Sequence, residues 1–217
     1  MENGNYTVHI VDDEEAVRKS LAFLLTMCGF AVRVHASATA FLSVAPTLDK
    51  GCLVTDLRMP DMSGVELLRR LGAAQALMPA IVVTGHGDVP MAVEAMKAGA
   101  LDFIEKPFED DVLVAAVRNA AAELAARPDK AHAVPEIRAR LEQLTDRERQ
   151  VLSGVVGGLP NKTIAFDLDI SPRTVEVHRA SIMTKMKAGS LAELVRMALL
   201  VELETLPAGT ATPSSRI

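Results

Sequence analysis

The feature that most constrains the fold is an alternation of two periodicities over the first 126 residues. Five short runs rich in β-branched and apolar residues are typical of buried strands, and amphipathic segments with helical spacing separate them. The predicted strands are Thr7–Val11, Ala31–His35, Leu53–Thr55, Ala80–Thr84 and Leu101–Ile104. The predicted helices are Glu15–Met27, Ser37–Val44, Val65–Leu71, Val89–Ala98 and Asp110–Ala126. Five βα units in this order predict a doubly wound α/β domain, with a five-stranded parallel sheet in flavodoxin-like strand order.

After residue 126 the periodicity becomes purely helical. Pro128 and Pro135 enclose a polar stretch, Arg127–Glu136, whose composition is typical of a linker between domains. The first and last predicted helices are Ile137–Leu144 and Leu191–Glu204. Between them, one helix begins with a capping box of Thr145 and Glu148 and ends at Gly157–Gly158, and the next begins at Pro160–Asn161. A further helix is capped by Ser171 and has Pro172 in its first turn. The expected domains are residues 1–126, a linker at 127–139, an all-α domain at 140–204 and a disordered tail at 205–217.

Composition excludes several classes of protein. An apolar fraction of 49% and a charged fraction of 24% are ordinary for a soluble globular chain. The sequence has no run of 18 uncharged apolar residues, so a membrane span is not expected. Acidic residues at 12–15 stand where a secretory signal would carry basic ones, so we expect a cytoplasmic protein. Cys28, Cys52 and the five scattered histidines lack metal-ligand spacing, so we expect buried reduced thiols and no zinc site.

The net charge of −5 conceals an asymmetry between the two halves of the chain. Residues 1–124 carry a formal charge of −7, whereas residues 125–217 carry +2. Within the second half, the segment Ser171–Gly189 holds four basic residues and one acid, which gives it a charge of +3. An acidic front half and a locally basic back half indicate two different partners.

Carboxylates follow two of the predicted strands. Asp12 and Asp13 come after the first strand and Asp56 after the third, and in flavodoxin-like order these strands are neighbours. The three side chains are therefore expected to converge, and their mutual repulsion favours a hard cation such as Mg²⁺ between them. Thr84 ends the fourth strand and Lys106 follows the fifth, so a hydroxyl and an ammonium group are expected at the same edge.

These groups suit phosphoryl transfer. A carboxylate such as that of Asp56 can attack phosphorus to form an acyl phosphate. Mg²⁺, Lys106 and Thr84 would stabilise the charge on the phosphoryl oxygens. The alternative is that acids at strand ends are ordinary solvated loop residues. Five suitable residues at four strand ends argue against that alternative.

Four segments carry a family resemblance over about residues 5–124: VDDEE, TDLRMPDMSG, VVTGHGD and DFIEKPF. They resemble the signature segments of two-component response-regulator receiver domains. The resemblance implies that Asp56 is the phosphoacceptor and that a sensor histidine kinase donates the phosphoryl group. It also implies that Asp13, Asp56 and the backbone carbonyl of Arg58 bind Mg²⁺, with Asp12 helping through water.

The same resemblance implies a switch. Thr84 and Phe103 occupy the switch positions, where Thr84 would move toward the phosphoryl group and Phe103 would rotate inward behind it. It further implies a cis peptide between Lys106 and Pro107. From periodicity alone, Phe103 is equally well explained as a core aromatic residue, and this alternative stays open.

The stretch Leu159–Lys187 has the pattern of a helix, a tight turn and a longer helix. With Val175 as the buried direction and about 100° per residue, Ile182 and Met186 fall on the same face. The opposite face is small, polar and basic, which suits a major groove, and His178 and Arg179 flank the buried stripe, where phosphate contacts are expected. The candidate DNA-binding residues are Lys162 and Thr163 at the start of the preceding helix, and Arg173, Thr174, Glu176, Val177, His178, Arg179 and Ala180.

The segments LTDRERQVL, NKTIAFDLDISPRTVEVHRASIMTKM and LAELVRMAL resemble the four-helix LuxR-type helix-turn-helix over about residues 140–203. Glu176 is a departure, because it puts an acid on the outer face. It could accept a hydrogen bond from a cytosine amino group or only exclude wrong sequences, and both remain open.

Together the two domains resemble response regulators of the FixJ type, transcriptional activators of nitrogen-fixation genes that a haem-based oxygen-sensing histidine kinase phosphorylates. The resemblance implies promoter DNA and RNA polymerase as partners. It also implies that the chain is not an enzyme, apart from autophosphotransfer and slow self-dephosphorylation at Asp56.

Three hypotheses compete. The first is a DNA-binding switch whose receiver forms a homodimer on phosphorylation through Val89–Ala98 and Leu101–Ile104, because a lone helix-turn-helix rarely supplies enough specific contacts. The second is a Mg²⁺-dependent phosphohydrolase with Asp56 as nucleophile, which needs an acid two residues later, where this chain has Arg58. The third is a phosphorelay or protein-binding module in which the helical domain contacts protein.

Overall fold

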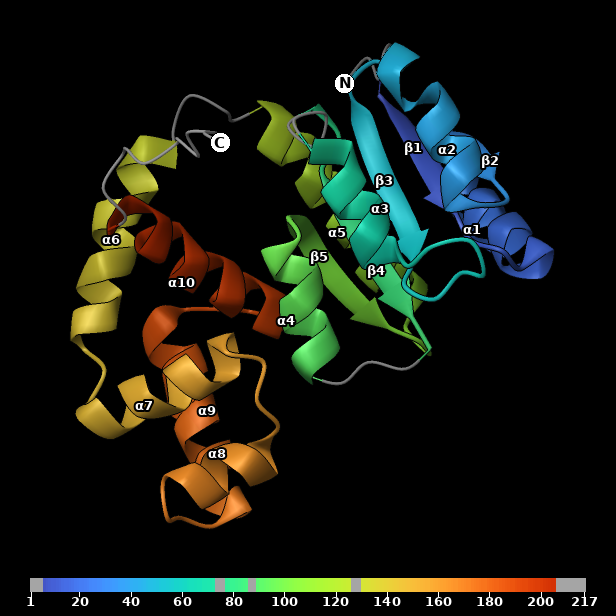
Figure 1. Ribbon diagram of the computed structural model, residues 1–217. Coiled ribbons are helices and arrows are strands. Elements are labelled where there is room, and N and C mark those ends of the chain that lie inside the picture. Colours follow the sequence, from blue (N-terminus) through green and yellow to red (C-terminus); the bar gives the residue numbers. More distant parts are fainter. Residues whose placement is uncertain (1–5, 73–76, 86–88, 126–129, 206–217) are drawn as a thin grey trace, which may run out of the picture.

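The computed structural model describes residues 6–72, 77–85, 89–125 and 130–205 (Figure 1). The strands are β1 (Thr7–Val11), β2 (Ala31–His35), β3 (Gly51–Asp56), β4 (Ala80–Thr84) and β5 (Ala100–Glu105). The helices are α1 (Glu15–Met27), α2 (Ala38–Val44), the 3-10 helix η1 (Ala45–Thr47), α3 (Gly64–Leu71), α4 (Val89–Lys97), α5 (Asp110–Ala125), α6 (Lys130–Glu142), α7 (Asp146–Val156), α8 (Asn161–Asp167), α9 (Pro172–Met186) and α10 (Leu191–Thr205). In these described ranges no helix is both long and apolar enough to cross a bilayer.

The five strands form one parallel sheet in the order β2-β1-β3-β4-β5. This confirms the flavodoxin-like α/β fold that the alternation of periodicities predicts. Because β1 and β3 are direct neighbours, the loops that follow them lie side by side at the carboxyl edge of the sheet. The topology therefore brings together residues that are more than 40 positions apart in sequence.

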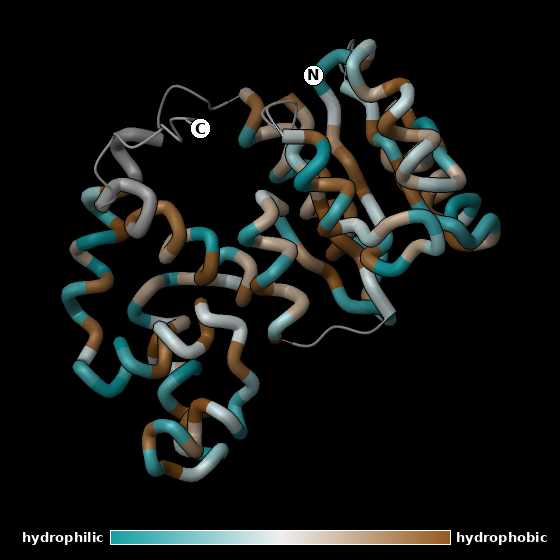
Figure 2. The backbone as a smooth tube through the Cα atoms, viewed as in Figure 1, coloured by the Kyte–Doolittle hydropathy of each residue, from teal (hydrophilic) through white to brown (hydrophobic). Residues whose placement is uncertain are grey.

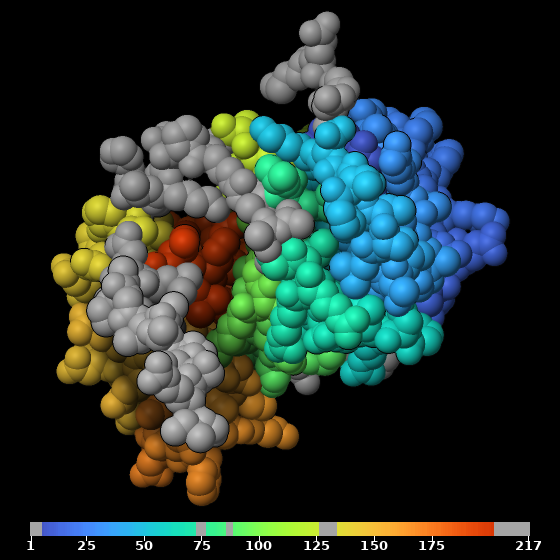
Figure 3. All heavy atoms as spheres, turned by 45° about the horizontal axis from the view of Figure 1, so that its top comes forward, coloured from blue at the N-terminus to red at the C-terminus, as the bar shows by residue number. Residues whose placement is uncertain are grey.

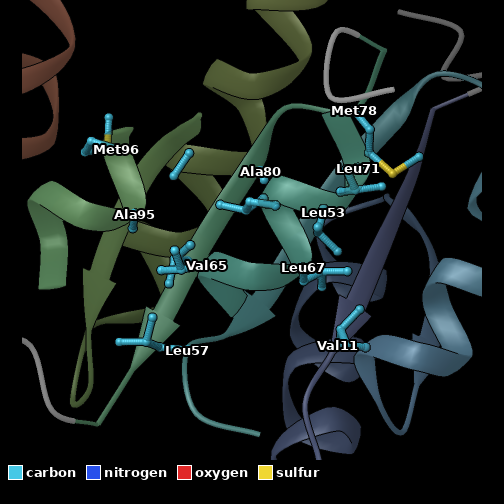
Figure 4. Packing of buried hydrophobic residues seen from close by; sticks show 14 of the residues in the cluster. Val11, Leu53, Leu57, Val65, Leu67, Leu71, Met78, Ala80, Ala95 and Met96 are labelled. Carbon is cyan, nitrogen blue, oxygen red and sulfur yellow. The ribbon is translucent and has the colours of Figure 1, made fainter. Parts of the chain in front are cut away.

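Helices cover both faces of the sheet, and alternate side chains of each strand point to opposite faces. Along β4, Ala80 and Val82 belong to the cluster under α2, α3 and α4, whereas Ile81 and Val83 belong to the cluster under α1 and α5. Figure 4 shows part of the first cluster, with Ala95 on α4 at one end. The continuous apolar character of the central strands is also visible in Figure 2.

The second domain, which we call the output domain, consists of α6 to α10 around a separate apolar cluster. Thr145 and Glu148 form the predicted capping box at the start of α7. The Ser171 side chain accepts a hydrogen bond from the Thr174 backbone N–H and caps α9, and Pro172 is the first residue of that helix. Local capping chemistry therefore decided where these two helices begin.

Helix α6 corrects one expectation. The sequence predicted a helix from Ile137, but α6 begins at Lys130 and contains Pro135, so much of the expected linker is helical. Proline removes one backbone hydrogen bond from a helix interior. Burial of Val134 and Ile137 offsets this cost, since both side chains are almost inaccessible to solvent. Tertiary packing thus overrides a local helix-breaking signal.

Other expectations differ by a residue or fall outside the description. Helix α10 includes Thr205, where the tail was expected to begin, and the rest of the tail lies outside the described residues. Cys52 is buried as expected, but Cys28 is exposed. Cys28 follows the last residue of α1, and Gly29 in the left-handed region turns the chain there, so its apolar sequence neighbours do not enclose it.

Candidate functional site

The carboxyl edge of the sheet holds an acidic pocket made by residues of three strand ends. Asp12 follows β1, Asp56 ends β3 and Lys106 follows β5. The Lys106 Nζ atom lies 3.3 Å from Asp12 Oδ2 and 3.2 Å from Asp56 Oδ1. The structure therefore brings these three side chains together, with the ammonium group between the two carboxylates.

Burial and charge oppose each other in this pocket. Burial raises the pKa of the Asp56 carboxyl, and the hydrogen bond from the Arg58 backbone N–H and the Lys106 charge lower it without cancelling the rise. Burial lowers the pKa of Lys106, but the Asp12 and Asp56 carboxylates outweigh it, so the net pKa is raised. Lys106 is therefore a firmly charged partner for anionic oxygens at this edge.

The loop between β1 and α1 is held by bonds that the sequence did not reveal. The Glu14 backbone N–H donates to Asp12 Oδ1 at 2.8 Å. Arg18 Nη1 donates to the backbone carbonyls of Asp12 and Asp13 at 2.7 and 2.8 Å. A guanidinium group on the first turns of α1 thus fixes both acids, and the position of Arg18 one helical turn beyond the acidic run was the available signal.

The loop after β3 approaches its own helix closely. The Arg58 N–H donates to Asp56 Oδ2 at 2.6 Å, and the Arg58 guanidinium lies 3.8 Å from Met91 Sδ on α4. A Cβ atom on Gly64 would lie 2.5 Å from the Asp56 carbonyl oxygen. Only glycine allows this approach without moving the strand end that carries Asp56, so the glycine of the MSG segment has a steric function.

The two expected switch residues lie on adjacent strands. Thr84 ends β4 and is buried, and its carbonyl accepts a hydrogen bond from the Lys106 N–H at 2.7 Å. Phe103 on β5 pairs with Val82 on β4 and is half-buried against the apolar cluster that includes residues of α4. The Lys106–Pro107 peptide is cis, as the resemblance implied. His86, Gly87 and Asp88 lie outside the described ranges.

The pocket offers hard oxygen donors for a divalent cation, but they are not gathered into a finished metal site. Asp12 and Asp56 share the Lys106 ammonium group, and Asp13 is exposed at the rim. Within the described ranges no three acidic, histidine or cysteine side chains are grouped closely enough to bind a metal ion. The donor chemistry fits Mg²⁺, and binding would require the carboxylates to exchange part of their contact with Lys106.

In the output domain, α9 has the two faces that the periodicity predicts. Val175, Ile182 and Met186 are fully buried in the domain core. Arg173, Glu176, Val177, Ala180, Thr184 and Lys187 are exposed, whereas Thr174, His178 and Arg179 are half-buried. The side chain of Arg173 is 84% exposed and Val177 is 58% exposed. An exposed helix face of this kind is available to a DNA groove.

Several of the expected DNA-binding residues form side-chain contacts within the protein. Arg173 Nη1 forms an ion pair with Glu176 Oε2 at 2.8 Å on the outer face of α9. Arg179 Nη1 donates to Asn161 Oδ1 at 2.7 Å, which joins α9 to the start of α8. Lys162 and Thr163 are exposed at that same helix start. Glu176 therefore forms an ion pair with Arg173 within the protein, which the sequence did not indicate.

A buried carboxylate fixes α9 against α7. Glu148 Oε1 accepts from Ser181 Oγ at 2.6 Å, and its Oε2 accepts from Lys185 Nζ at 2.7 Å. Oε2 also accepts from the Thr145 N–H and hydroxyl. The sequence predicted the capping box but not these bonds to α9, because they join residues more than 30 positions apart.

Phe166 on α8 was not singled out either. Its ring is 85% exposed, which is unusual for a large aromatic side chain. It belongs to the apolar run of the segment NKTIAFDLDI, so periodicity alone could not separate it from the core residues Ile164 and Ala165.

Comparisons with known proteins agree with this architecture. Residues 8–118 match the response regulator receiver domain, and residues 142–198 match the bacterial regulatory proteins of the luxR family. The transcriptional regulatory protein FixJ of Rhizobium meliloti is 69% identical over 195 residues, which cover 90% of this chain and 96% of that protein. FixJ of Azorhizobium caulinodans is 58% identical over 207 residues, with coverage of 95% and 97%.

Two solved structures add detail on the domains. Full-length FixJ from B. japonicum is 50% identical and overlaps 91% of this chain and 97% of that chain with a TM-score of 0.54. The crystal structure of FixJ-N is 71% identical and overlaps 55% of this chain and 96% of that one with a TM-score of 0.53. The chain belongs to the two-component response regulators of the FixJ type, with an N-terminal receiver domain and a C-terminal LuxR-type DNA-binding domain.

Proposed function

We propose that Asp56 accepts a phosphoryl group from a sensor histidine kinase and that the phosphorylated chain regulates transcription by binding promoter DNA. The observation that carries this proposal is the Lys106 ammonium group held 3.2 Å from Asp56 Oδ1 in a pocket that includes Asp12. An Asp56 oxygen attacks phosphorus, the bond between phosphorus and the kinase histidine breaks, and the imidazole leaves. The Lys106 ammonium group then stabilises the negative charge on the phosphoryl oxygens of the acyl phosphate.

Mg²⁺ is the proposed cofactor of this step. Asp12, Asp13 and Asp56 supply carboxylate oxygens, and the Arg58 backbone carbonyl is the further ligand that the family resemblance implies. When bound, Mg²⁺ neutralises charge on the phosphoryl oxygens. Arg18 fixes the position of two of these ligands, because it donates hydrogen bonds to the backbone carbonyls of Asp12 and Asp13.

The proposed switch leads from the pocket to α4 and β5. Thr84 turns toward the phosphoryl oxygens and Phe103 follows it inward, which changes the surface of Val89–Ala98 and Leu101–Ile104. Two phosphorylated receivers then pair through this surface as a homodimer. We call it the pairing surface. A dimer presents two copies of α9 to two half-sites and so gains the contacts that one helix lacks.

DNA recognition is assigned to the exposed face of α9. Arg173, Thr174, Glu176, Val177 and Ala180 are placed for base contacts, and Lys162, Thr163, His178 and Arg179 for the phosphate backbone. The relatives are named transcriptional regulatory protein FixJ. The resemblance to the FixJ type implies a nitrogen-fixation activator, whose partners would include RNA polymerase and an oxygen-sensing kinase.

The phosphoacceptor is tested by incubating the chain with phosphoramidate, with and without Mg²⁺, and measuring the mass increase. Wild type should gain one phosphoryl group in the presence of Mg²⁺, and Asp56→Asn should gain none. Asp61→Asn is the matched control, since Asp61 lies in the same loop but accepts hydrogen bonds from Thr39. Full phosphorylation of Asp56→Asn, or of wild type after complete metal removal, would contradict the proposal.

DNA binding is tested by selection of duplexes from a random library with the phosphorylated chain. The recovered site should then be bound in a fluorescence anisotropy titration with an affinity that falls steeply as salt is raised. If no sequence is enriched, the third hypothesis, an output domain that contacts protein, gains support. The phosphohydrolase hypothesis is disfavoured because the Arg58 side chain lies on Met91 and offers no general acid.

A further inference from the structure

Phe166 is an aromatic side chain that the folding of the output domain leaves in water. Its ring is 85% exposed, the highest value among the large apolar side chains that the structure describes. The neighbouring residues Ile164 and Ala165 are buried and supply the contact of α8 with the domain core. An exposed phenyl ring contributes little to stability, because its apolar surface stays in contact with water. Folding of the output domain therefore does not explain this side chain.

A groove of about 220 Å³ lies between α7 and α8. Its apolar lining comes from Leu159, Ile164 and Leu168, and its polar lining includes Gln150, Ser153 and Asp167. Successive residues of a helix are about 100° apart, so Asp167 lies between the Phe166 ring and the side of α8 that Ile164 marks. We call Phe166, Asp167 and this groove the α8 surface.

The α8 surface carries negative charge. Asp167 and, two residues later, Asp169 are both exposed. Neither carboxylate belongs to an ion pair among the described residues. Asp167 is the last residue of α8, where the negative end of the helix dipole disfavours an acid, so this charge does not stabilise the helix. It disfavours contact with DNA phosphates and favours contact with a basic protein surface.

The α8 surface lies beside the DNA-binding face and is separate from it. Phe166 follows Lys162 by four residues, which puts both on one side of α8. The hydrogen bond of 2.7 Å from Arg179 Nη1 to Asn161 Oδ1 joins α9 to the start of α8. Figures 1 and 3 show the orange segment that contains both helices at the end of the molecule away from the blue strands of the receiver. With α9 in a major groove, α8 therefore holds Phe166 in a fixed place next to the duplex.

We infer that the α8 surface binds RNA polymerase when the chain is on promoter DNA. This inference rests on the proposed function and names the surface through which that function reaches the polymerase. The polymerase presents an apolar side chain to the groove, an apolar contact to Phe166 and a basic side chain to Asp167. Aromatic residues that pack into a partner are among those that dominate the binding energy of protein interfaces.

Charge argues against two other occupants of the α8 surface. DNA would bring phosphates against Asp167 and Asp169, and the described residues that line the groove include no lysine or arginine. A second copy that paired through the same surface would bring the acids of two chains together, because a two-fold interface joins identical patches. A polymerase subunit with basic side chains meets neither repulsion, and it occupies the same duplex as the bound chain.

The test separates DNA binding from polymerase binding. The duplex joins the site selected by the phosphorylated chain to a core promoter. Gel-shift titrations measure the dissociation constant of the phosphorylated chain with and without the RNA polymerase holoenzyme of the host bacterium, and the ratio of the two constants measures their coupling. The variants are Phe166→Ala, Phe166→Leu and Asp167→Asn. Phe23→Ala is the matched control, because Phe23 is 69% exposed on α1 of the receiver.

Without polymerase, all four variants should bind the duplex as wild type does. With polymerase, Phe166→Ala should lose about tenfold of the gain in affinity, because truncation of an aromatic residue at an interface commonly costs that much. Phe166→Leu keeps an apolar side chain and should retain most of the gain, and Asp167→Asn should lose about threefold. Single-round transcription from the same duplex should fall in the same order. Circular dichroism confirms that each variant is folded, and a purely structural defect would weaken DNA binding as well.

An unchanged ratio for Phe166→Ala, or an equal loss for Phe23→Ala, would overturn the inference. Weaker binding of Phe166→Ala to DNA alone would assign the ring to DNA, and weaker self-association of the phosphorylated variant in sedimentation would assign it to a second copy. Either result would also overturn the inference. A wild type that selects a site but gains nothing from polymerase would contradict the inference alone. Failure of the proposed function looks different, because wild type would then select no site or take up no phosphoryl group from phosphoramidate.

Discussion

The Glu148 network predicts how firmly the recognition helix is held. Replacing Glu148 with alanine removes the acceptor for Ser181 and Lys185 on α9 and for two donors of Thr145 on α7. The carboxylate is 5% exposed, so water cannot replace these bonds in the folded protein. The change therefore affects the attachment of α9 and the start of α7 together.

The magnitude follows from the surroundings of each partner. Removing one member of a buried ion pair costs about 3–5 kcal/mol. The Lys185 side chain is 32% exposed and can regain water, so we expect about 3 kcal/mol for Glu148→Ala. Glutamine preserves the shape and a carbonyl acceptor for Thr145, and we expect about 1 kcal/mol for Glu148→Gln. For a domain of this size the alanine variant should melt about 15 °C lower.

Calorimetry of the full chain measures the melting, and amide exchange assigns the loss to residues 137–201. The Lys185 and Ser181 hydrogen bonds lower the pKa of Glu148 to about 2. Because the folded pKa is below the unfolded value, this stabilisation is present above about pH 4.5 and is lost as the pH falls toward 2. The difference between wild type and Glu148→Gln should shrink over the same interval. The reasoning would be refuted if wild type and Glu148→Ala melted at the same temperature. It would also be refuted if the stability difference between wild type and Glu148→Gln stayed the same down to pH 2.

Three further predictions concern other parts of the chain. His9 is 2% exposed, stacks on His35 and shares a hydrogen bond with it, and burial lowers its pKa to about 4. The unfolded chain therefore binds the extra proton below pH 6.5, and wild type should lose about 2 kcal/mol of stability between pH 7 and 5 that His9→Phe retains in urea unfolding. Gly64→Ala should slow phosphorylation by phosphoramidate and destabilise the receiver by about 1–3 kcal/mol, because its Cβ would lie 2.5 Å from the Asp56 carbonyl oxygen. Gly189→Ala is the control: its Cβ would lie 3.4 Å from Glu193 Oε2, so neither the phosphorylation rate nor the stability should change. In anisotropy titrations Lys162→Ala should weaken binding to all duplexes and reduce the salt slope by about one, whereas Val177→Ala should alter sequence preference without changing the slope.

Much of the receiver could be predicted because its information is local. Strand and helix periodicities along residues 7–126 gave the element order, and parallel strands must place their carboxyl ends at one edge. The convergence of Asp12, Asp56 and Lys106 follows from that rule alone. Their roles in phosphoryl transfer rest on chemistry and resemblance, and remain proposals.

The α6 helix shows the limit of local signals. Pro135 indicates a linker when it is considered with its polar neighbours, yet the chain is helical there because Val134 and Ile137 find an apolar surface. The cost of one lost hydrogen bond is small beside the burial of two aliphatic side chains. Such a competition depends on what packs against the segment, which the segment itself does not encode.

By itself, the sequence determined the two domains, the strand order, the acidic edge and the two faces of α9, because each depends on periodicity, capping or the direction of parallel strands. Tertiary structure alone decided which residues support those features. The pairing of His9 with His35, the bonds from Arg18 to the acidic loop and the burial of Ala192 and Val195 against α4 all join positions through packing. A helix such as α10 shows two apolar faces in its sequence, but only the folded chain reveals that the second face covers the receiver.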